Sequence, residues 1–220
     1  MSDALERAQE LDQYFTRPAL AKAVVEWANI QPGARVLEPS CGAGAMVRWM
    51  PHSAVVHAMD IDQAVLDTWD EERKSRLGFQ VLGDFLQHQA SSDAYDIAIM
   101  NPPYGFTGSG KVRQAADRLH VQHALRMCPE VICLVRANFL WGQERYNHVL
   151  RFARVVRMAV LVHRPSFHGP AVAVDGKGGQ HEMMVLHLER RPDRALSSTP
   201  ECVSDQTRLE YWTADWRIDP

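Results

Sequence analysis

Short apolar segments alternate with longer amphipathic or polar stretches along most of this 220-residue chain. The segments are four to six residues long and rich in Val, Ile, Leu and Met, which is typical of strands buried on both faces of a sheet. Strands are expected at residues 35–38, 54–59, 79–82, 95–100, 131–135, 157–162 and 183–188. Because helices fit between them, we predict a doubly wound α/β fold with a mostly parallel, seven-stranded sheet.

Several of the intervening stretches carry helix signals. Pro18 is typical of a helix start, so a helix is expected over residues 19–30. Two long glycine-containing stretches interrupt the alternation and have the length of functional loops. The further helices are expected from Asp62 to about residue 76, over 112–127 and around 144–152, and the two loops are residues 105–110 and 164–180. In such a sheet the ligand lies beyond the carboxyl ends of the strands.

The composition is typical of a globular protein, with 46% hydrophobic and 23% charged residues. The first residues show no basic segment followed by an apolar one, and no apolar run is long enough to cross a bilayer. Neither a signal peptide nor a membrane partner is therefore expected. The four cysteines lie far apart and form no CxxC pair, which favours reduced thiols in the cytoplasm over a disulfide framework or a metal site.

The charged residues are distributed unevenly along the chain. Residues 1–104 carry 8 Lys and Arg against 15 Asp and Glu, whereas residues 105–170 carry 10 against 3, a net charge of +7. Residues 171–220 carry 6 against 9. A basic segment at 105–170 in an otherwise acidic chain indicates a face that meets phosphates, and hence a nucleic-acid partner. A set of solvated helix faces is the alternative interpretation.

A glycine-containing turn follows the first expected strand. Gly42 and Gly44 would let the backbone approach a ligand and would open a helix whose N-terminal amides bind that ligand. The pattern is not GxGxxG and no P-loop lysine follows, which disfavours dinucleotide and ATP sites. Glu38, at the end of the strand, adds a carboxylate that suits a ligand bearing a positive charge.

Carboxylates also follow the second and third expected strands. Asp60 is expected to bind both hydroxyls of a ribose, and Asp62 to cap the next helix. Asp84 could accept a hydrogen bond from an adenine amino group, and Phe85 could lie against the adenine ring. The alternative for this pair is a plain turn with a core phenylalanine.

The fourth expected strand ends in the candidate catalytic motif Asn101-Pro102-Pro103-Tyr104. The two prolines fix φ and donate no hydrogen bonds, so they hold a rigid turn. The Asn101 amide oxygen and the Pro102 carbonyl could accept the two N–H groups of an aromatic amine such as adenine N6. That would localise its lone pair for attack on a sulfonium methyl. Tyr104 could then stack on a base that has left its duplex.

These motifs, in this order, resemble those of the amino-type, S-adenosyl-L-methionine-dependent DNA methyltransferases that modify adenine N6, notably short members from phages and mobile elements. The resemblance covers about residues 12–190. It implies a Rossmann-like class I methyltransferase domain with an antiparallel last strand, a cofactor half near 12–90 and a catalytic half near 94–190. It also implies that Phe167 packs on the flipped base, unless Phe167 anchors its loop to the core. The cofactor residues implied are Tyr14, Phe15, Thr16, Glu38, Pro39, Gly42, Gly44, Asp60, Ile61, Asp84, Phe85 and Asn101.

One feature departs from that family. Relatives with this motif order usually add a large C-terminal domain that reads the target sequence, whereas only a polar tail, residues 191–220, follows here. No separate recognition domain is therefore expected. Sequence reading would fall to residues 105–117 and 164–180, or to a partner subunit.

The expected activity is methyl transfer to adenine N6 in DNA, with several alternatives open. Adenine N6 in ribosomal RNA and the amide of protein glutamine use the same amine chemistry. A cytosine N4 enzyme usually has Ser in the place of Asn101, and a cytosine C5 enzyme needs a nucleophilic Pro-Cys pair, whereas Cys41 lies in the cofactor turn. The chain could also be a non-catalytic, nucleic-acid-binding subunit of a methyltransferase, although the intact catalytic motif argues against this.

Overall fold

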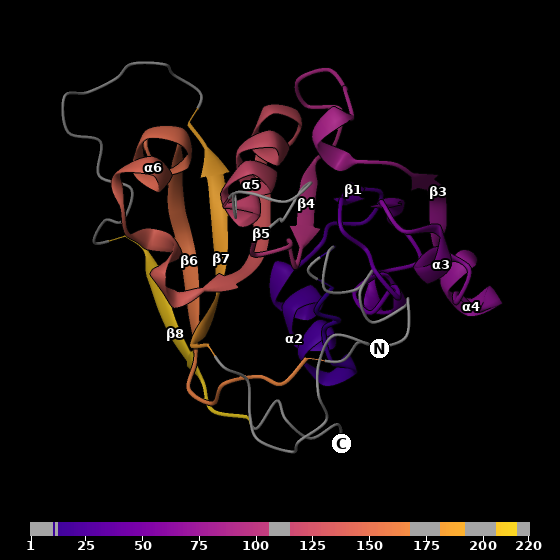
Figure 1. Ribbon diagram of the computed structural model, residues 1–220, viewed down its shortest axis with the longest axis horizontal. Helices are drawn as coiled ribbons and strands as arrows, with labels where there is room; N and C mark the ends of the chain where they lie inside the picture. Colours follow the sequence, from indigo (N-terminus) through magenta and orange to yellow (C-terminus); the bar gives the residue numbers. More distant parts are fainter. Residues whose placement is uncertain (1–10, 12, 106–114, 168–180, 192–205, 215–220) are drawn as a thin grey trace.

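Eight strands form one sheet in the computed structural model, which describes residues 11, 13–105, 115–167, 181–191 and 206–214. Their order across the sheet is β3-β2-β1-β4-β5-β7-β6-β8 (Figure 1). The strands are β1 (Arg35–Glu38), β2 (Val55–Asp60), β3 (Leu77–Leu82), β4 (Ile97–Met100), β5 (Glu130–Arg136), β6 (Ala153–Leu161), β7 (Met183–Arg190) and β8 (Arg208–Trp212).

Neighbouring strands are parallel except at β7, which pairs antiparallel with both β5 and β6. The predicted doubly wound, mostly parallel α/β sheet with one antiparallel strand is therefore confirmed. The strand order reverses between β1 and β4: the chain continues from β1 to β2 and β3 on one side, and from β4 to β5 on the other. An α/β sheet binds its ligand at such a switch point.

The expected count of seven strands is wrong, because part of the polar tail adds β8. This strand pairs parallel with the outer edge of β6. Glu210 in β8 accepts hydrogen bonds from the Trp27 indole (3.1 Å) and from Arg157 (3.4 Å), so the strand is also tied to the first helix. The strand is short and lies in a polar stretch, so its sequence carried no separate signal.

The first helices are shorter than the sequence indicated. Helix α2 (Pro18–Ala28) begins at its proline, as expected. The single helix expected from Asp62 to about residue 76 is instead two one-turn helices, α3 (Gln63–Leu66) and α4 (Glu71–Lys74). Asp62 and Asp70 each accept a hydrogen bond from a backbone amide, and each of these N-caps starts its own helix.

The second half of the chain contains α5 (Ala116–Met127), and its expected start at residue 112 lies outside the described residues. The helix expected around 144–152 is a short α6 (Gln143–Arg145) continued by the π-helix η5 (Tyr146–Leu150). Three short 3₁₀ segments complete the described elements: η1 (Val47–Trp49), η2 (Phe85–Gln87) and η4 (Ala137–Leu140).

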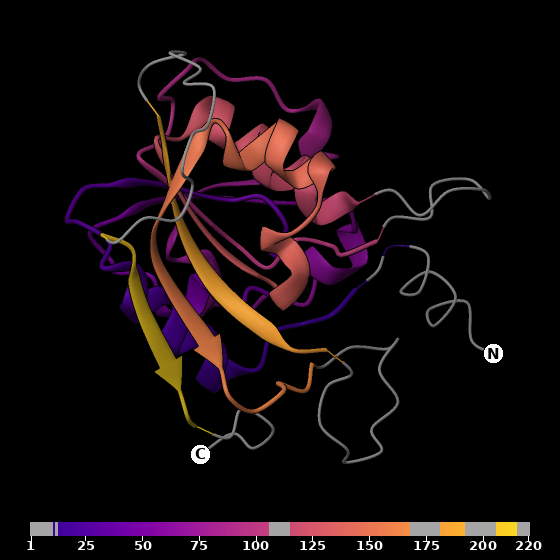
Figure 2. The same cartoon turned by 90° about the vertical axis from the view of Figure 1, so that its left-hand side faces the viewer.

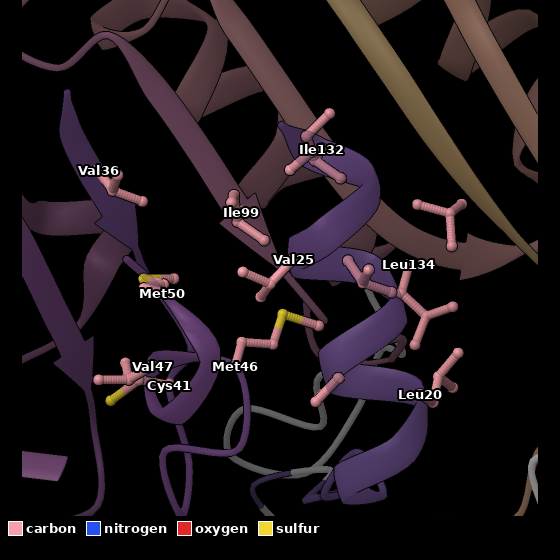
Figure 3. Close-up of a cluster of buried hydrophobic side chains, with 14 of the residues drawn as sticks. Leu20, Val25, Val36, Cys41, Met46, Val47, Met50, Ile99, Ile132 and Leu134 are labelled. Atoms are coloured by element: carbon pink, nitrogen blue, oxygen red, sulfur yellow. The ribbon is translucent and has the colours of Figure 1, made fainter. Parts of the chain in front are cut away.

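Apolar side chains cover both faces of the sheet in two clusters. On one face α2 packs on alternate residues of the central strands, among them Ile99, Ile132 and Leu134 (Figure 3). On the other face α5 and η5 pack on the residues in between, such as Met100 and Cys133. Figure 2 shows α2 and α5 on opposite sides of the sheet. The central strands are thus buried on both faces, as their nearly continuous apolar sequences predict.

The described cysteines, Cys41, Cys128 and Cys133, are buried free thiols. Burial raises the pKa of the Cys128 thiol to about 12, so at neutral pH this side chain is a protonated core residue. In the part of the chain that the structure describes, no helix combines the length and the apolar character needed to cross a membrane.

We expect Leu134→Ala to lower the free energy of unfolding by about 2–5 kcal/mol, because the fully buried side chain would leave a cavity under α2. The matched control is Val162→Ala just beyond β6, where half of the side chain is exposed; its effect should stay within about 0.5 kcal/mol. Urea unfolding followed by circular dichroism measures both. Equal effects of the two substitutions would contradict this packing.

Candidate active site

The carboxyl ends of the strands around the switch point open onto two adjoining pockets. The larger has a volume of about 920 Å³, counted with the space open to solvent, and the smaller about 290 Å³. Five residues line both pockets, so the two lie side by side and are together called the cleft here: Tyr14, Phe15, Ser40, Gly42 and Asn101. Its position at the carboxyl ends of the strands, beside the switch point, is typical of the ligand site of such a sheet.

The site residues predicted from the sequence divide between the two pockets. The larger pocket brings together Tyr14, Phe15, Pro39, Gly42, Asp60, Ile61, Asp84, Phe85, Asn101, Pro102 and Pro103. The smaller pocket is lined by Tyr14, Phe15, Thr16, Glu38, Gly42 and Asn101. Three predicted residues line neither pocket: Gly44, Tyr104 and Phe167.

Gly42 is the closest point between the turn after β1 and the N-terminal segment. Its φ is +49°, and a Cβ atom there would lie 3.0 Å from the ring of Phe15. The amide of Gly42 donates to Asp60 Oδ2 at 2.8 Å, while Asp60 Oδ1 accepts from the amide of Asp62 at 2.9 Å. Each Asp60 oxygen therefore holds part of the turn in place and keeps a lone pair for a ligand hydroxyl.

Gly44, which lines neither pocket, lies against a neighbouring side chain instead. It has a φ of +74°, and a Cβ atom there would lie 2.9 Å from the indole of Trp69. The Trp69 indole in turn donates to the carbonyl of Gly42 at 2.8 Å. Gly44 thus makes room for a side chain that braces the turn. The helix expected after this turn is also absent, because η1 is a single 3₁₀ turn.

The carboxylates that end β1 and β2 are buried. Glu38 is 2% exposed, and its Oε2 has no hydrogen-bond partner among the described residues. Burial, together with the nearby Asp60, raises the pKa of Glu38 well above its usual value, and burial also raises the pKa of Asp60. A buried acceptor without a partner is costly. A ligand that carries a positive amino group into the smaller pocket would remove this cost.

The residues after β2 and β3 lie along the larger pocket. Ile61 is 44% exposed, whereas Asp62 is buried and caps α3, as expected. Asp84 caps η2, with its Oδ1 accepting from the amide of Leu86 at 2.9 Å, and it also lines the pocket. Phe85 lines the same pocket from the core. The two interpretations of Asp84 and Phe85, as turn and core residues or as ligand contacts, are therefore compatible.

Asn101 lies where the two pockets meet. Its Nδ2 donates to the carbonyl of Tyr14 (3.0 Å) and to Thr16 Oγ1 (3.1 Å), and its Oδ1 accepts from the hydroxyl of Tyr104. Because a carbonyl can only accept, the contact with Tyr14 fixes which side of the amide carries the nitrogen. The N-terminal segment therefore holds the donor side of the amide and leaves its oxygen facing the other way.

Tyr104 is not an open stacking surface in this structure. Its ring is buried. The ring centroid lies 6.1 Å from that of Tyr14, 6.2 Å from that of Phe167 and 5.0 Å from the guanidinium of Arg136. Phe167 is half-buried and packs against the cluster under α2, which fits its alternative role as an anchor. A base could reach the face of Tyr104 only after one of these neighbours moves.

Eight residues that line the larger pocket are not among the site residues predicted from the sequence: Leu11, Gln13, Ser40, Gly83, Leu86, Ala116, Leu119 and His120. Gln13 donates to Asp62 at 2.8 Å, and Ala116, Leu119 and His120 come from α5. The spacing of the three α5 residues places them on one helix face, which is a signal that the sequence contains. The packing of α5 decides that this face meets the cleft.

Several arginines of the basic segment 105–170 are engaged within the fold. Four pair with carboxylates: Arg145 with Asp117, Arg154 with Glu189, Arg157 with Glu210 and Arg164 with Glu182. Because a carboxylate lies beside each of these four arginines, their positive charge is largely balanced locally. The net charge of the segment therefore overstates the positive surface that the described residues present. Residues 106–114 and 168–180, which contain most of the two expected loops, lie outside the described residues.

Comparison with known proteins gives a relative in sequence. The chain is 32% identical over 106 residues, or 46% of its length, to the type II methyltransferase M.TthHB8I of Thermus thermophilus. The match covers 23% of that enzyme, so the chain spans about a quarter of the length of this relative. No protein-family profile matches the chain.

Solved structures are similar to the chain over most of its length. A putative class I S-adenosylmethionine-dependent methyltransferase from Listeria monocytogenes superposes with a TM-score of 0.68 at 12% identity, covering 96% of this chain and 68% of that one. A putative RNA methyltransferase from Pyrococcus horikoshii has a TM-score of 0.62 at 19% identity, covering 83% and 89%. The chain thus has the fold of class I methyltransferases, for which S-adenosyl-L-methionine is the expected cofactor.

Proposed function

We propose that this protein transfers a methyl group from S-adenosyl-L-methionine to the exocyclic N6 of adenine in DNA. The observation that carries the proposal is the fixed orientation of the Asn101 amide at the junction of the two pockets. Its nitrogen is held by Tyr14 and Thr16, so the oxygen, which now accepts from the Tyr104 hydroxyl, is the atom that can receive a substrate amine. An acceptor is what the amine needs there.

The cleft fits the cofactor in two parts. In the larger pocket, Asp60 would bind the ribose, and Ile61, Asp84 and Phe85 would enclose the adenine. In the smaller pocket, the unpartnered oxygen of Glu38 would receive the positively charged amino group of the methionine part. The N-terminal segment Tyr14–Thr16 lines this pocket, Gly42 lines both pockets, and Pro39 lines the larger one.

The chemistry requires the chain to hold a poor nucleophile in line with a reactive methyl. The bound cofactor supplies an electrophilic methyl on its sulfonium. Asn101 Oδ1 and the carbonyl of Pro102 would accept the two N–H groups of adenine N6, which draws its lone pair out of the ring and toward the methyl. Pro103 holds the turn rigid, because neither proline can rotate about φ.

Tyr104 would change partners when the base arrives. Its hydroxyl now donates to Asn101 Oδ1, the same oxygen that would receive the substrate amine. Release of this bond frees the oxygen and lets the ring turn toward the cleft, where it would stack on the flipped base at a gain of about 1–3 kcal/mol. Phe167, whose ring lies 6.2 Å from Tyr104, would then cover the other side of the base.

DNA is the favoured substrate for two reasons. The relative in sequence is described as a type II methyltransferase, and the segment 105–170, which would contact the phosphates, is the basic part of the chain. We place the methyltransferase domain at residues 1–190, with β8 of the following tail closing its sheet. The likeness to a putative RNA methyltransferase makes RNA the first alternative to test.

Incubation with labelled S-adenosyl-L-methionine and either unmethylated DNA, total RNA or total protein tests the substrate directly. After digestion to nucleosides, we expect N6-methyl-2′-deoxyadenosine from the DNA sample. Chromatography with mass spectrometry identifies it. Methylated adenosine from RNA alone would move the activity to RNA, and label on protein alone would make the chain a protein methyltransferase. Label on none of the three would contradict catalysis by this chain.

Asn101→Ala is expected to reduce turnover by about 10²–10³-fold, because the amine loses a preorganised partner. The affinity for S-adenosyl-L-homocysteine, measured by calorimetry, should change by less than about threefold, since most cofactor contacts remain. Asn138→Ala, at an exposed position in η4, is the matched control and should leave both quantities unchanged. Turnover retained in Asn101→Ala would remove this residue from the mechanism.

The two glycines of the turn should respond differently to alanine. Gly42→Ala strains a φ of +49° and also places a Cβ atom 3.0 Å from Phe15 in the cleft, so besides lowering stability it should weaken binding of S-adenosyl-L-homocysteine by at least about tenfold. Gly44→Ala strains a φ of +74° against Trp69 outside the cleft, so it should lower stability by about 1–3 kcal/mol and spare binding to the folded protein. Calorimetry and urea unfolding separate the two effects. The reverse pattern would contradict these roles of the two glycines.

A further inference from the structure

Among the residues that the structure describes, His120 is the one histidine of α5 that lines the larger pocket. It is 9% exposed, and its ring centroid lies 5.5 Å from that of Phe85. It therefore reaches the pocket beside the two residues, Asp84 and Phe85, that would enclose the adenine of the cofactor. The other proposed adenosine contacts come from the first half of the chain, whereas His120 comes from the second.

The hydrogen bonds of His120 define its two nitrogens. Nδ1 lies 2.9 Å from the carbonyl of Ala116, and because a carbonyl only accepts, Nδ1 carries the hydrogen. In the neutral ring Nε2 is then an acceptor. Burial lowers the pKa of His120 to about 4, although Asp84 and Asp117 act to raise it, while His123 acts to lower it further. Within the described residues Nε2 has no hydrogen-bond partner.

We propose that His120 Nε2 accepts a hydrogen bond from the exocyclic amine of the cofactor's adenine, and that it selects a 6-amino purine over a 6-oxo purine. This inference rests on the proposed function, because it adds one contact to the proposed binding site of the cofactor. Asp84 uses one carboxylate oxygen to cap η2 and keeps the other for the same amine. Two acceptors on one amine reject a carbonyl in its place, because oxygen would then face oxygen and nitrogen lone pairs.

His123 supplies a matched control on the same helix. Its ring lies 4.9 Å from that of Phe85, so it packs on the same core phenylalanine as His120. Its Nε2, however, bonds to the carbonyl of His88 at 2.8 Å, and the residue does not line the pocket. Replacing His123 therefore disturbs the packing around Phe85 without removing an acceptor from the cleft.

The test compares binding of S-adenosyl-L-homocysteine with binding of S-inosyl-L-homocysteine, its 6-oxo counterpart, by calorimetry at pH 7.5. The unmodified protein should prefer the adenosyl compound by about 100-fold or more. His120→Phe keeps a ring in the site and should bind the adenosyl compound about tenfold more weakly, with the preference reduced by a similar factor. His123→Phe should keep the preference of the unmodified protein.

His120→Gln provides a second readout that does not depend on how His120→Phe folds. A glutamine amide presents either its oxygen or its NH₂ group, so this variant should keep its affinity for the adenosyl compound within about threefold and bind the inosyl compound more tightly. An unchanged preference in both His120 variants would overturn the role of His120 while leaving the proposed function intact. Failure of the unmodified protein to bind S-adenosyl-L-homocysteine would instead overturn the proposed function, and this inference with it.

Discussion

The parallel pairing of β1 with β4 is the contact on which the cleft depends. The chain continues from β1 to β2 on one side of this pair and from β4 to β5 on the other, so the two connections lead away from each other. The turn that contains Gly42 and the turn that contains Asn101 therefore end side by side with a pocket between them. Burial of the strands on both faces makes these two turns rigid, because any shift of a strand end would open gaps in both clusters.

The N-terminal segment completes the cleft, although it belongs to neither strand. The carbonyl of Tyr14 and the hydroxyl of Thr16 orient Asn101, and the ring of Phe15 fits against Gly42 because glycine has no Cβ. Helix α2 anchors the segment, since it begins two residues after Thr16 and packs on the sheet through fully buried side chains such as Leu20. The packing of a helix on one face of the sheet thus sets the orientation of an amide at its edge.

The cleft collects polar groups that folding alone leaves unsatisfied. Glu38 has a buried oxygen without a partner among the described residues, and His120 offers an acceptor nitrogen there. Tyr104 occupies the oxygen of Asn101 that the substrate amine would need. Glu38 and His120 thus lack a hydrogen-bond partner that a ligand could supply, as is typical of functional sites, whereas Asn101 already has a partner that the substrate amine would replace. Each of the three has a complementary atom in the proposed cofactor or base.

The sequence by itself determined the α/β class, the order of the central strands along the chain and the motifs at their ends. These are local properties, since a short apolar run between turn residues specifies a buried strand and its last residues lie at the edge of the sheet. Only the tertiary structure decided that β8 joins the sheet, that Gly44 accommodates Trp69, that His120 faces the cleft and that Tyr104 is buried. Each of these depends on contacts between residues far apart in the chain, and periodicity identifies a side chain's face but not the partner that covers it.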